Sequence, residues 1–330
     1  MKLGSARWGL TVALVLAACD SRVEGVETPA SAGAGGTSAA GAAMAGTSAG
    51  PSGGGGSAGE TSSSGTGATV TAGSTGSAGS AAGAAAVEAC ASGGFAWPHG
   101  AKAAVSLTYD DGLPSQLANA TPSLESSGLV ATLFLSESYG GFEARKSQYQ
   151  ALAAKGFELA AHTVKHPCFG LTPDLKGYDQ AALATELDQN IATLRALGMS
   201  GALTFAYPCG NTEYGEPAQT YVPLIEERFF AARGVNCCAQ VPAAVDLYNV
   251  NTNWPAETAT AADVTTPVDQ AIAAGSWLVF GFHAVGAAPG EWSAVPQEAH
   301  DALVAHLVAK KSEIWVATFG AVADYVKRCR

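Results

Sequence analysis

From about residue 97 onward, short apolar runs alternate with longer stretches that carry apolar residues every three to four positions. Short apolar runs bounded by turn residues are typical of buried strands, and the longer spacing is typical of helices. The clearest helix is 180–197, with Gly198 behind it as a stop signal. Further helices are expected at 297–310 and 321–328. The expected strands are 103–108, 129–135, 157–161, 202–207, 229–234, 247–250, 277–282 and 314–317.

Alternation of strands and helices over this length predicts an α/β fold with a parallel sheet, either open or closed into a barrel. In a parallel barrel the carboxyl ends of the strands share one face, where active sites are built. Polar residues follow four of the expected strands at this end: Asp110 with Asp111, His162, the Pro208–Gly210 turn, and His283. We therefore expect these residues to meet on one face.

The first 89 residues have a different character from the rest. Lys2 and Arg7 precede an apolar run, 10–18, that is shorter than the ~20 residues of a membrane span and is typical of a secretory signal. The letters "LAAC", residues 16–19, resemble the lipobox of bacterial lipoproteins. We predict a signal peptide at 1–18 and Cys19 as the lipidated residue, which would anchor the chain to a bacterial membrane.

Residues 19–89 then read as a Gly, Ala, Ser and Thr-rich linker, with no Lys or Arg between Arg22 and Lys102. Such a composition has too little apolar surface to offset the entropy of ordering, so a flexible tether is expected. The remaining residues, 90–330, are enough for one domain with a sizeable core.

Charge and cysteine content narrow the class of protein. The formal net charge of −11 argues against a nucleic-acid partner. Six cysteines remain besides Cys19, and an even number in an exported protein suggests disulfides, although 15 pairings are possible. A Cys90–Cys329 bond would tie the two ends of the domain together. The other four are Cys168, Cys209, Cys237 and Cys238.

The sequence "HTVKHP" contains two histidines, His162 and His166, at positions i and i+4. On a helical turn they would share one face and could bind one metal ion. Two imidazoles are an incomplete site, and Asp111 from another strand end is a candidate third ligand. An Asp–His–His set with open positions is typical of a catalytic metal centre. The spacing alone also suits two surface histidines near a turn.

The Asp pair in "SLTYDDG" divides naturally into two roles. Side chains of neighbouring residues on an extended segment point in different directions. Asp111 can therefore face a metal while Asp110 acts as general base on the attacking water. In isolation, the same letters would suggest a turn that caps a helix.

His283 ends the apolar run "WLVFGFH" and is the candidate general acid. A histidine in this context can equally be structural, satisfied by a hydrogen bond in the core. His99, His300 and His306 are expected to be structural or solvated.

Together, "SLTYDDG", "HTVKHP", "AYPCG" and "FGFH" resemble the successive motifs of the polysaccharide deacetylases, the NodB-homology enzymes that form the fourth family of carbohydrate esterases. The opening "WPHGAKAAVSLTYDDG" and the closing "IWVATFGAVADYV" fit as well, so the resemblance runs from about Trp97 to the C-terminus. It implies a distorted (β/α) barrel of about seven strands. It also implies metal-dependent removal of acetyl groups from sugars.

The resemblance also implies roles for individual residues. Asp110 would be the base and His283 the acid, and the backbone N–H of Cys209 would bind the oxyanion. The metal is usually zinc, with cobalt or another divalent ion as alternatives. Its ligands would be Asp111, His162 and His166, and the substrate pocket would include Tyr207, Pro208 and Trp254.

This chain departs from the family pattern at three positions. Ala206 stands where many members have an Arg that pairs with the base, Cys209 stands where an aromatic residue is usual, and Asn253–Trp254 stands where Asp-Trp is usual. Arg233 is a candidate source of the missing cation, although nothing in the sequence singles it out. A Cys168–Cys209 disulfide could fix the pocket, but either cysteine could instead pair with Cys237 or Cys238.

These observations predict a tethered, lipid-anchored carbohydrate deacetylase acting on an acetylated polysaccharide or oligosaccharide. N-acetylglucosamine-type glycans and O-acetylated polysaccharides are both possible, because the two bonds require the same attack on a carbonyl. One alternative is a glycan-binding lipoprotein that has lost turnover. Another is a metal amidohydrolase that acts on a non-sugar amide.

Overall fold

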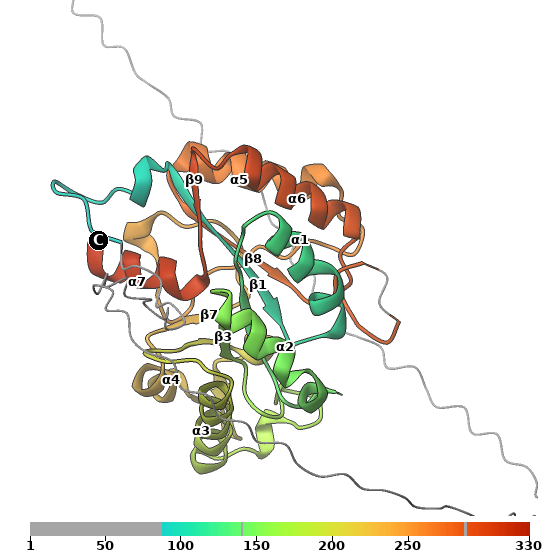
Figure 1. Cartoon of the computed structure of the whole chain (residues 1–330). Helices are drawn as coiled ribbons and strands as arrows, with labels where there is room; N and C mark the ends of the chain where they lie inside the picture. The colour runs from blue at the N-terminus through green and yellow to red at the C-terminus, as the bar shows by residue number, and fades with distance from the viewer. Residues whose placement is uncertain (1–87, 140, 287–288) are drawn as a thin grey trace, which may run out of the picture. The chain divides into compact units, whose positions relative to one another are not determined.

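A parallel sheet of seven strands forms the centre of the molecule (Figure 1). The structure is a computed structural model and describes residues 88–139, 141–286 and 289–330. The strand order is β7-β4-β3-β2-β1-β8, and β9 also pairs with β1. The strands are β1 Ala103–Asp110, β2 Thr132–Leu135, β3 Glu158–Ala161, β4 Thr204–Ala206, β7 Ala231–Arg233, β8 Trp277–Phe282 and β9 Ile314–Val316.

The two ends of this strand order are joined by the segment 247–253. Val250 pairs with Arg233 of β7, and Asn253 pairs with Phe280 of β8, both in parallel. Backbone hydrogen bonds accompany these pairs, from Gly234 N–H to the Val250 carbonyl and from Gly281 N–H to the Asn253 carbonyl. The sheet thus closes through an irregular strand, which confirms the predicted distorted barrel.

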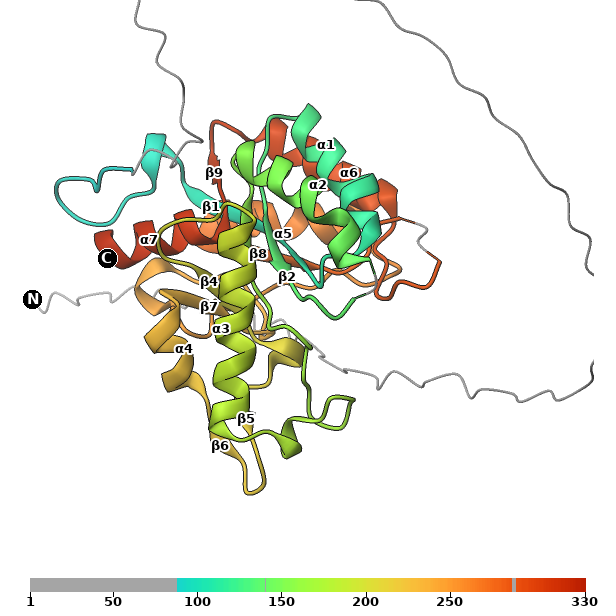
Figure 2. The ribbon, with the colours of Figure 1, turned by 60° about the horizontal axis from the view of Figure 1, so that its bottom comes forward.

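Helices lie around this barrel, with α5 and α6 packed side by side and α3 and α4 in another part of the molecule (Figure 1). A short antiparallel hairpin, β5–β6, lies near the start of α3 (Figure 2). The helices are η1 Pro98–Gly100, η2 Gln116–Ala120, α1 Thr121–Ser126, α2 Phe142–Ala154, η3 Leu175–Gly177, α3 Gln180–Ala196, η4 Pro208–Gly210, α4 Val222–Arg228, η5 Pro242–Ala244, α5 Ala261–Ala274, α6 Gln297–Ala309 and α7 Phe319–Cys329; the hairpin strands are β5 Glu213–Tyr214 and β6 Gln219–Thr220.

The apolar runs in the sequence become the buried strands of the barrel. Every residue of β1 and β8 is buried, because both faces of a parallel strand are covered. The predicted bounds of β8 match the structure. The helix expected at 180–197 ends at Ala196, and Gly198 follows in a left-handed conformation at φ 103°. The strand expected at 247–250 is present only as the irregular closing segment.

Three disulfides are present among the described residues: Cys90–Cys329, Cys168–Cys209 and the adjacent pair Cys237–Cys238. The first is the link suggested between the ends of the domain, and the second is one of the pairings that the sequence left open. Disulfides are typical of exported proteins. The predicted signal peptide, the lipidation site Cys19 and nearly all of the linker lie outside the described residues. Within them, no helix is long and apolar enough to cross a bilayer.

Candidate active site

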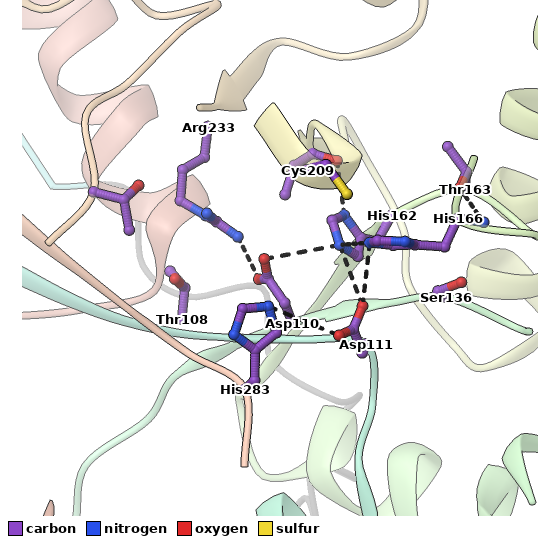
Figure 3. A network of polar contacts seen from close by, with 12 residues as sticks. Thr108, Asp110, Asp111, Ser136, His162, Thr163, His166, Cys209, Arg233 and His283 are labelled. Carbon is purple, nitrogen blue, oxygen red and sulfur yellow. Dashed lines mark hydrogen bonds and ion pairs between the residues drawn. The ribbon is translucent and has the colours of Figure 1, made fainter. Parts of the chain in front are cut away.

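The two carboxylates at the end of β1 face different neighbours (Figure 3). Asp110 is the last residue of the strand, and Asp111 adopts a left-handed conformation at φ 74°, which ends the extended segment. Asp110 contacts Arg233 and also lies 3.8 Å from His162, whereas Asp111 lies close to both His162 and His166. The two carboxylates therefore share His162 but differ in their second neighbour, Arg233 for Asp110 and His166 for Asp111.

Asp111, His162 and His166 form a cluster whose ligand atoms converge. Asp111 Oδ1 lies 3.5 Å from His162 Nε2 and 3.4 Å from His166 Nε2, and the two imidazole nitrogens are 3.1 Å apart. Asp111 Oδ1 is buried and accepts no hydrogen bond from the described residues. A buried, unpartnered carboxylate oxygen facing two imidazole nitrogens suits a divalent ion such as zinc. The three residues therefore fit the predicted metal ligand set.

The turn that carries the two histidines is not helical, so the predicted helical geometry is wrong. Thr163 and His166 both have positive φ, 63° and 53°, and the chain bends sharply between the two histidines. The i and i+4 side chains meet because of this bend. His166 N–H donates to Thr163 Oγ1 at 3.0 Å, and Glu186 of α3 accepts from the N–H groups of Val164 and Lys165. Helix α3 thus supports the turn from outside the cluster.

His162 is held at both its backbone and its ring. Its N–H donates to Asn190 Oδ1 at 3.0 Å, and its Nδ1 lies 2.8 Å from the Ala206 carbonyl. A ring nitrogen bonded to a carbonyl leaves the other nitrogen free to ligate, which is the usual arrangement of metal-binding histidines. Ala206 therefore contributes through its backbone, although it lacks the arginine side chain usual at this position in the family.

The pKa shifts in the cluster reflect burial and mutual charge. Burial would raise the pKa of Asp111, but its contact with His162 and the charges of the neighbouring histidines lower the pKa below its usual value. Burial, together with the charge of His162, lowers the pKa of His166 to about 4. Burial would lower the pKa of His162, but Asp110 and Asp111 outweigh it and raise the pKa. At neutral pH His166 is therefore an uncharged imidazole, the form that binds metals.

Arg233 is the cation that pairs with Asp110. Its guanidinium contacts Asp110 Oδ1, and the two side chains are only 1% and 5% exposed. The guanidinium also lies 4.8 Å from the Phe134 ring and 5.1 Å from the Trp254 ring. Ala206 and Arg233 are register partners on the neighbouring strands β4 and β7. The arginine is therefore displaced by one strand relative to the family pattern and still reaches the same carboxylate.

His283, directly after β8, lies on the other side of the cluster. Its Nε2 is 3.9 Å from Asp111 Oδ2, and its side chain is 25% exposed, which suits a group that must meet substrate. The ring stacks on Trp254 with centroids 5.0 Å apart and an angle of 22°. Gly281 makes room for this stack, because a Cβ there would lie 2.7 Å from the Trp254 ring. The structure thus brings together both residues that were predicted from distant motifs.

The turn η4, which follows β4, contains the predicted oxyanion donor. Cys209 has φ 53°, and the hydrogen bonds that close the turn are donated by Gly210 and Asn211, so they do not use the Cys209 N–H. Pro208 is buried. The Tyr207 ring packs against Phe205 and Tyr221 in the core. The pocket role predicted for Tyr207 and Pro208 stays a prediction.

Two residues at the site were missed from the sequence. Trp292 Nε1 donates to Asp111 Oδ2 at 3.2 Å, and its ring lies 4.7 Å from that of Tyr139. Gln116 is buried and donates from Nε2 to the carbonyls of Asp110 and His283, which links the ends of β1 and β8. Neither residue belongs to a recognisable motif, and both act through contacts across the barrel.

Comparison with known proteins agrees with this geometry. Residues 98–220 match the model of the family described as polysaccharide deacetylase. We expected the resemblance to continue to the C-terminus, but Arg233, Trp254 and His283 lie beyond the matched segment. A search of curated proteins found no match.

Several solved structures are similar in part. A carbohydrate esterase domain of a multidomain xylanase from the hindgut metagenome of Trinervitermes trinervoides is 14% identical, with a TM-score of 0.44, covering 68% of this chain and 90% of that one. The peptidoglycan deacetylase PdaC from Bacillus subtilis is 14% identical, with a TM-score of 0.46, covering 68% and 92%. A family 4 carbohydrate esterase from Streptomyces lividans is 20% identical, with a TM-score of 0.41, covering 66% and 91%. Identities this low do not transfer a substrate to this chain.

The polysaccharide deacetylase model covers the segment that contains Asp110, Asp111, His162, His166 and Cys209. This match supports the class of enzyme expected from the sequence, a hydrolase that acts on acetyl groups of carbohydrates.

Proposed function

We propose that this chain is a metal-dependent deacetylase of acetylated polysaccharides or oligosaccharides, with Asp110 as base and His283 as acid. The observation that carries the proposal is the separation of the two carboxylates at the end of β1. Asp111 faces two imidazole nitrogens, while Asp110 faces the buried Arg233. If the two aspartates only formed a turn, neither a cluster with two histidines nor a buried ion pair with Arg233 would be expected.

Asp111, His162 and His166 would hold the ion. A divalent ion in this position would lower the pKa of water and polarise the acetyl carbonyl. The neutral His166 and the ionised Asp111 are the protonation states that ligation requires. Zinc suits this nitrogen and oxygen donor set, with cobalt as an alternative.

The remaining residues would handle protons and the developing charge. Asp110 accepts a proton from the attacking water, and Arg233 contacts and orients this carboxylate. The Cys209 N–H donates a hydrogen bond to the carbonyl oxygen as it becomes negative. His283 donates a proton to the departing amine or alkoxide, after which acetate leaves. Trp254 stacks on His283 and would hold its ring in place.

Acetate release from a substrate panel tests this proposal. The full chain, stripped with a chelator and then reloaded with zinc or cobalt, is assayed on N-acetylated chito-oligosaccharides, O-acetylated xylan and a simple acetamide. Release from at least one sugar substrate, lost on chelation and restored by metal, is the expected result. Release from the acetamide alone would instead favour an amidohydrolase. Glycan binding without release from any substrate would contradict the proposed turnover.

Variants then test the assigned roles. Asp110→Asn and His283→Ala should each lower kcat by roughly a hundredfold or more. The matched controls are Asp188→Asn, which alters a surface ion pair with Arg228, and His306→Ala, which alters a surface ion pair with Asp269. Full activity in Asp110→Asn would show that the base is another residue.

The anchoring of the domain is a separate proposal. The lipobox-like "LAAC" and the Gly/Ala/Ser/Thr-rich linker support lipidation at Cys19 and a tethered barrel at a bacterial membrane. Metabolic labelling with a fatty-acid analogue checks this. Label should enter the wild type and be absent from Cys19→Ser.

A further inference from the structure

The Cys168–Cys209 disulfide joins the two turns that carry the chemistry of the site. Cys168 lies two residues after the ligand His166, and Cys209 is the proposed oxyanion donor. The two cysteines are 41 residues apart in the chain, with a Cα–Cα distance of 5.9 Å. A second link runs alongside, from Phe169 N–H to Asn211 Oδ1 at 3.1 Å. The position of one turn therefore depends on that of the other.

Both turns contain residues in an unfavourable backbone conformation. Among the described residues, six non-glycine residues have positive φ, and four of them are at this site: Asp111, Thr163, His166 and Cys209. Such conformations persist only where the surrounding structure enforces them. A covalent bond between the two turns is the strongest available constraint of this kind.

The disulfide also touches the ligand His166 directly. His166 Nδ1 lies 3.6 Å from Cys168 Sγ, whereas the corresponding nitrogen of His162 lies 2.8 Å from a backbone carbonyl. In metal sites the second imidazole nitrogen normally bonds to a carboxylate, a carbonyl or water, and this partner orients the ring. For His166 the disulfide sulfur occupies that place, and the centroid of the Tyr139 ring lies 5.6 Å from that of the imidazole.

We propose that the Cys168–Cys209 disulfide is a positioning element of the active site, which orients His166 toward the metal and places the Cys209 N–H at the oxyanion. The proposal rests on the function proposed above. Opening the bond consumes two electrons and two protons from a dithiol reductant and yields two thiols, while the reductant becomes a disulfide. The site is thereby sensitive to reduction, unlike a site held only by hydrogen bonds.

A pair of double variants tests this positioning role. Cys168→Ser/Cys209→Ser removes the bond, and both cysteines are replaced because free thiols at these positions could bind a metal together with His166. Cys90→Ser/Cys329→Ser is the matched control. It removes a disulfide that spans 239 residues and is distant in sequence from every proposed site residue. For each protein, zinc affinity is measured by competition with a chelating dye, kcat and KM by acetate release, and folding by circular dichroism.

We expect Cys168→Ser/Cys209→Ser to bind zinc about 10–100-fold more weakly and to lose a similar factor in kcat, with KM nearly unchanged. The control should keep zinc affinity and kcat within about twofold, even though the longer loop gives its disulfide the larger effect on unfolding. Equal zinc affinity and kcat in both double variants would overturn the proposal.

The remaining outcomes are also decisive. Because Cys168 is buried and its serine hydroxyl could destabilise the turn, Cys168→Ala/Cys209→Ala is made as well. If neither double variant folds while the control does, the bond is required for folding and the positioning proposal is wrong. Zinc affinity can be measured whether or not the protein is catalytically active, so it tests the positioning role separately from the proposed function. A wild type that releases no acetate, together with zinc affinity that still depends on the disulfide, would refute the proposed function and support the positioning role.

Discussion

Replacing Arg233 with methionine tests how this site differs from the family pattern that it resembles. Methionine keeps much of the buried volume but removes the cation that contacts Asp110. Arg233 and Asp110 are 1% and 5% exposed, so water cannot take over the lost interaction. Ala206, the register partner of Arg233, offers no replacement charge.

The size of the effect follows from this burial. Removing one partner of a buried ion pair costs about 3–5 kcal/mol, because the other charge is left uncompensated. If about 3 kcal/mol of this cost is lost from transition-state stabilisation, kcat/KM drops by roughly a hundredfold. Each tenfold change in rate corresponds to about 1.36 kcal/mol.

The assay is kcat/KM for acetate release at one pH, compared with Arg228→Met as control. Arg228 also pairs with an aspartate, Asp188, but this pair is on the surface and should contribute less than about 1 kcal/mol. The double variant Ala206→Arg/Arg233→Ala restores the cation from the neighbouring strand and should recover part of the activity. Arg233→Met with unchanged kcat/KM would refute the assigned role of this pair.

Three further predictions concern residues around the site and in the core. Trp254→Ala removes the ring stacked on His283 and should lower kcat by about tenfold with little change in KM, measured by acetate release. Burial lowers the pKa of His300 to about 4. The folded state therefore binds fewer protons than the unfolded state between about pH 6.5 and 4, and stability falls as pH falls through this range. The free energy of unfolding of wild type and His300→Gln is measured by chemical denaturation at pH 6.5 and pH 4. Between these pH values the wild type should lose on the order of 3 kcal/mol more than the variant. Glu158 accepts hydrogen bonds from Thr132, Thr204 and the Gly320 N–H. Glu158→Ala leaves these donors without a partner and should lower the free energy of unfolding by about 2–3 kcal/mol. Glu158→Gln should lower it by less, and chemical denaturation at pH 7 measures both.

The strands and the clearest helix were predictable because their signals are local. An apolar run bounded by polar residues gives β8 its bounds, and a stop glycine gives α3 its end. Helix α5 begins with an equally local signal, a capping box formed by Thr260 and Asp263. The turn at His162–His166, in contrast, is not the helical turn that the i and i+4 spacing predicts. Its bend depends on Glu186 and Asn190 of α3, which the sequence of the turn does not contain.

The sequence by itself determined which residue types are available for the chemistry: two adjacent carboxylates after a buried strand, two histidines four residues apart, and a histidine at the end of β8. Only the tertiary structure decided how they are supported. Arg233 on β7 contacts Asp110 on β1, 123 residues away in the chain, because the sheet curls and closes through the segment 247–253. Cys168 pairs with Cys209 because two turns meet at one end of the barrel. Register and turn placement depend on the closure of the whole sheet, so no local stretch of sequence encodes them.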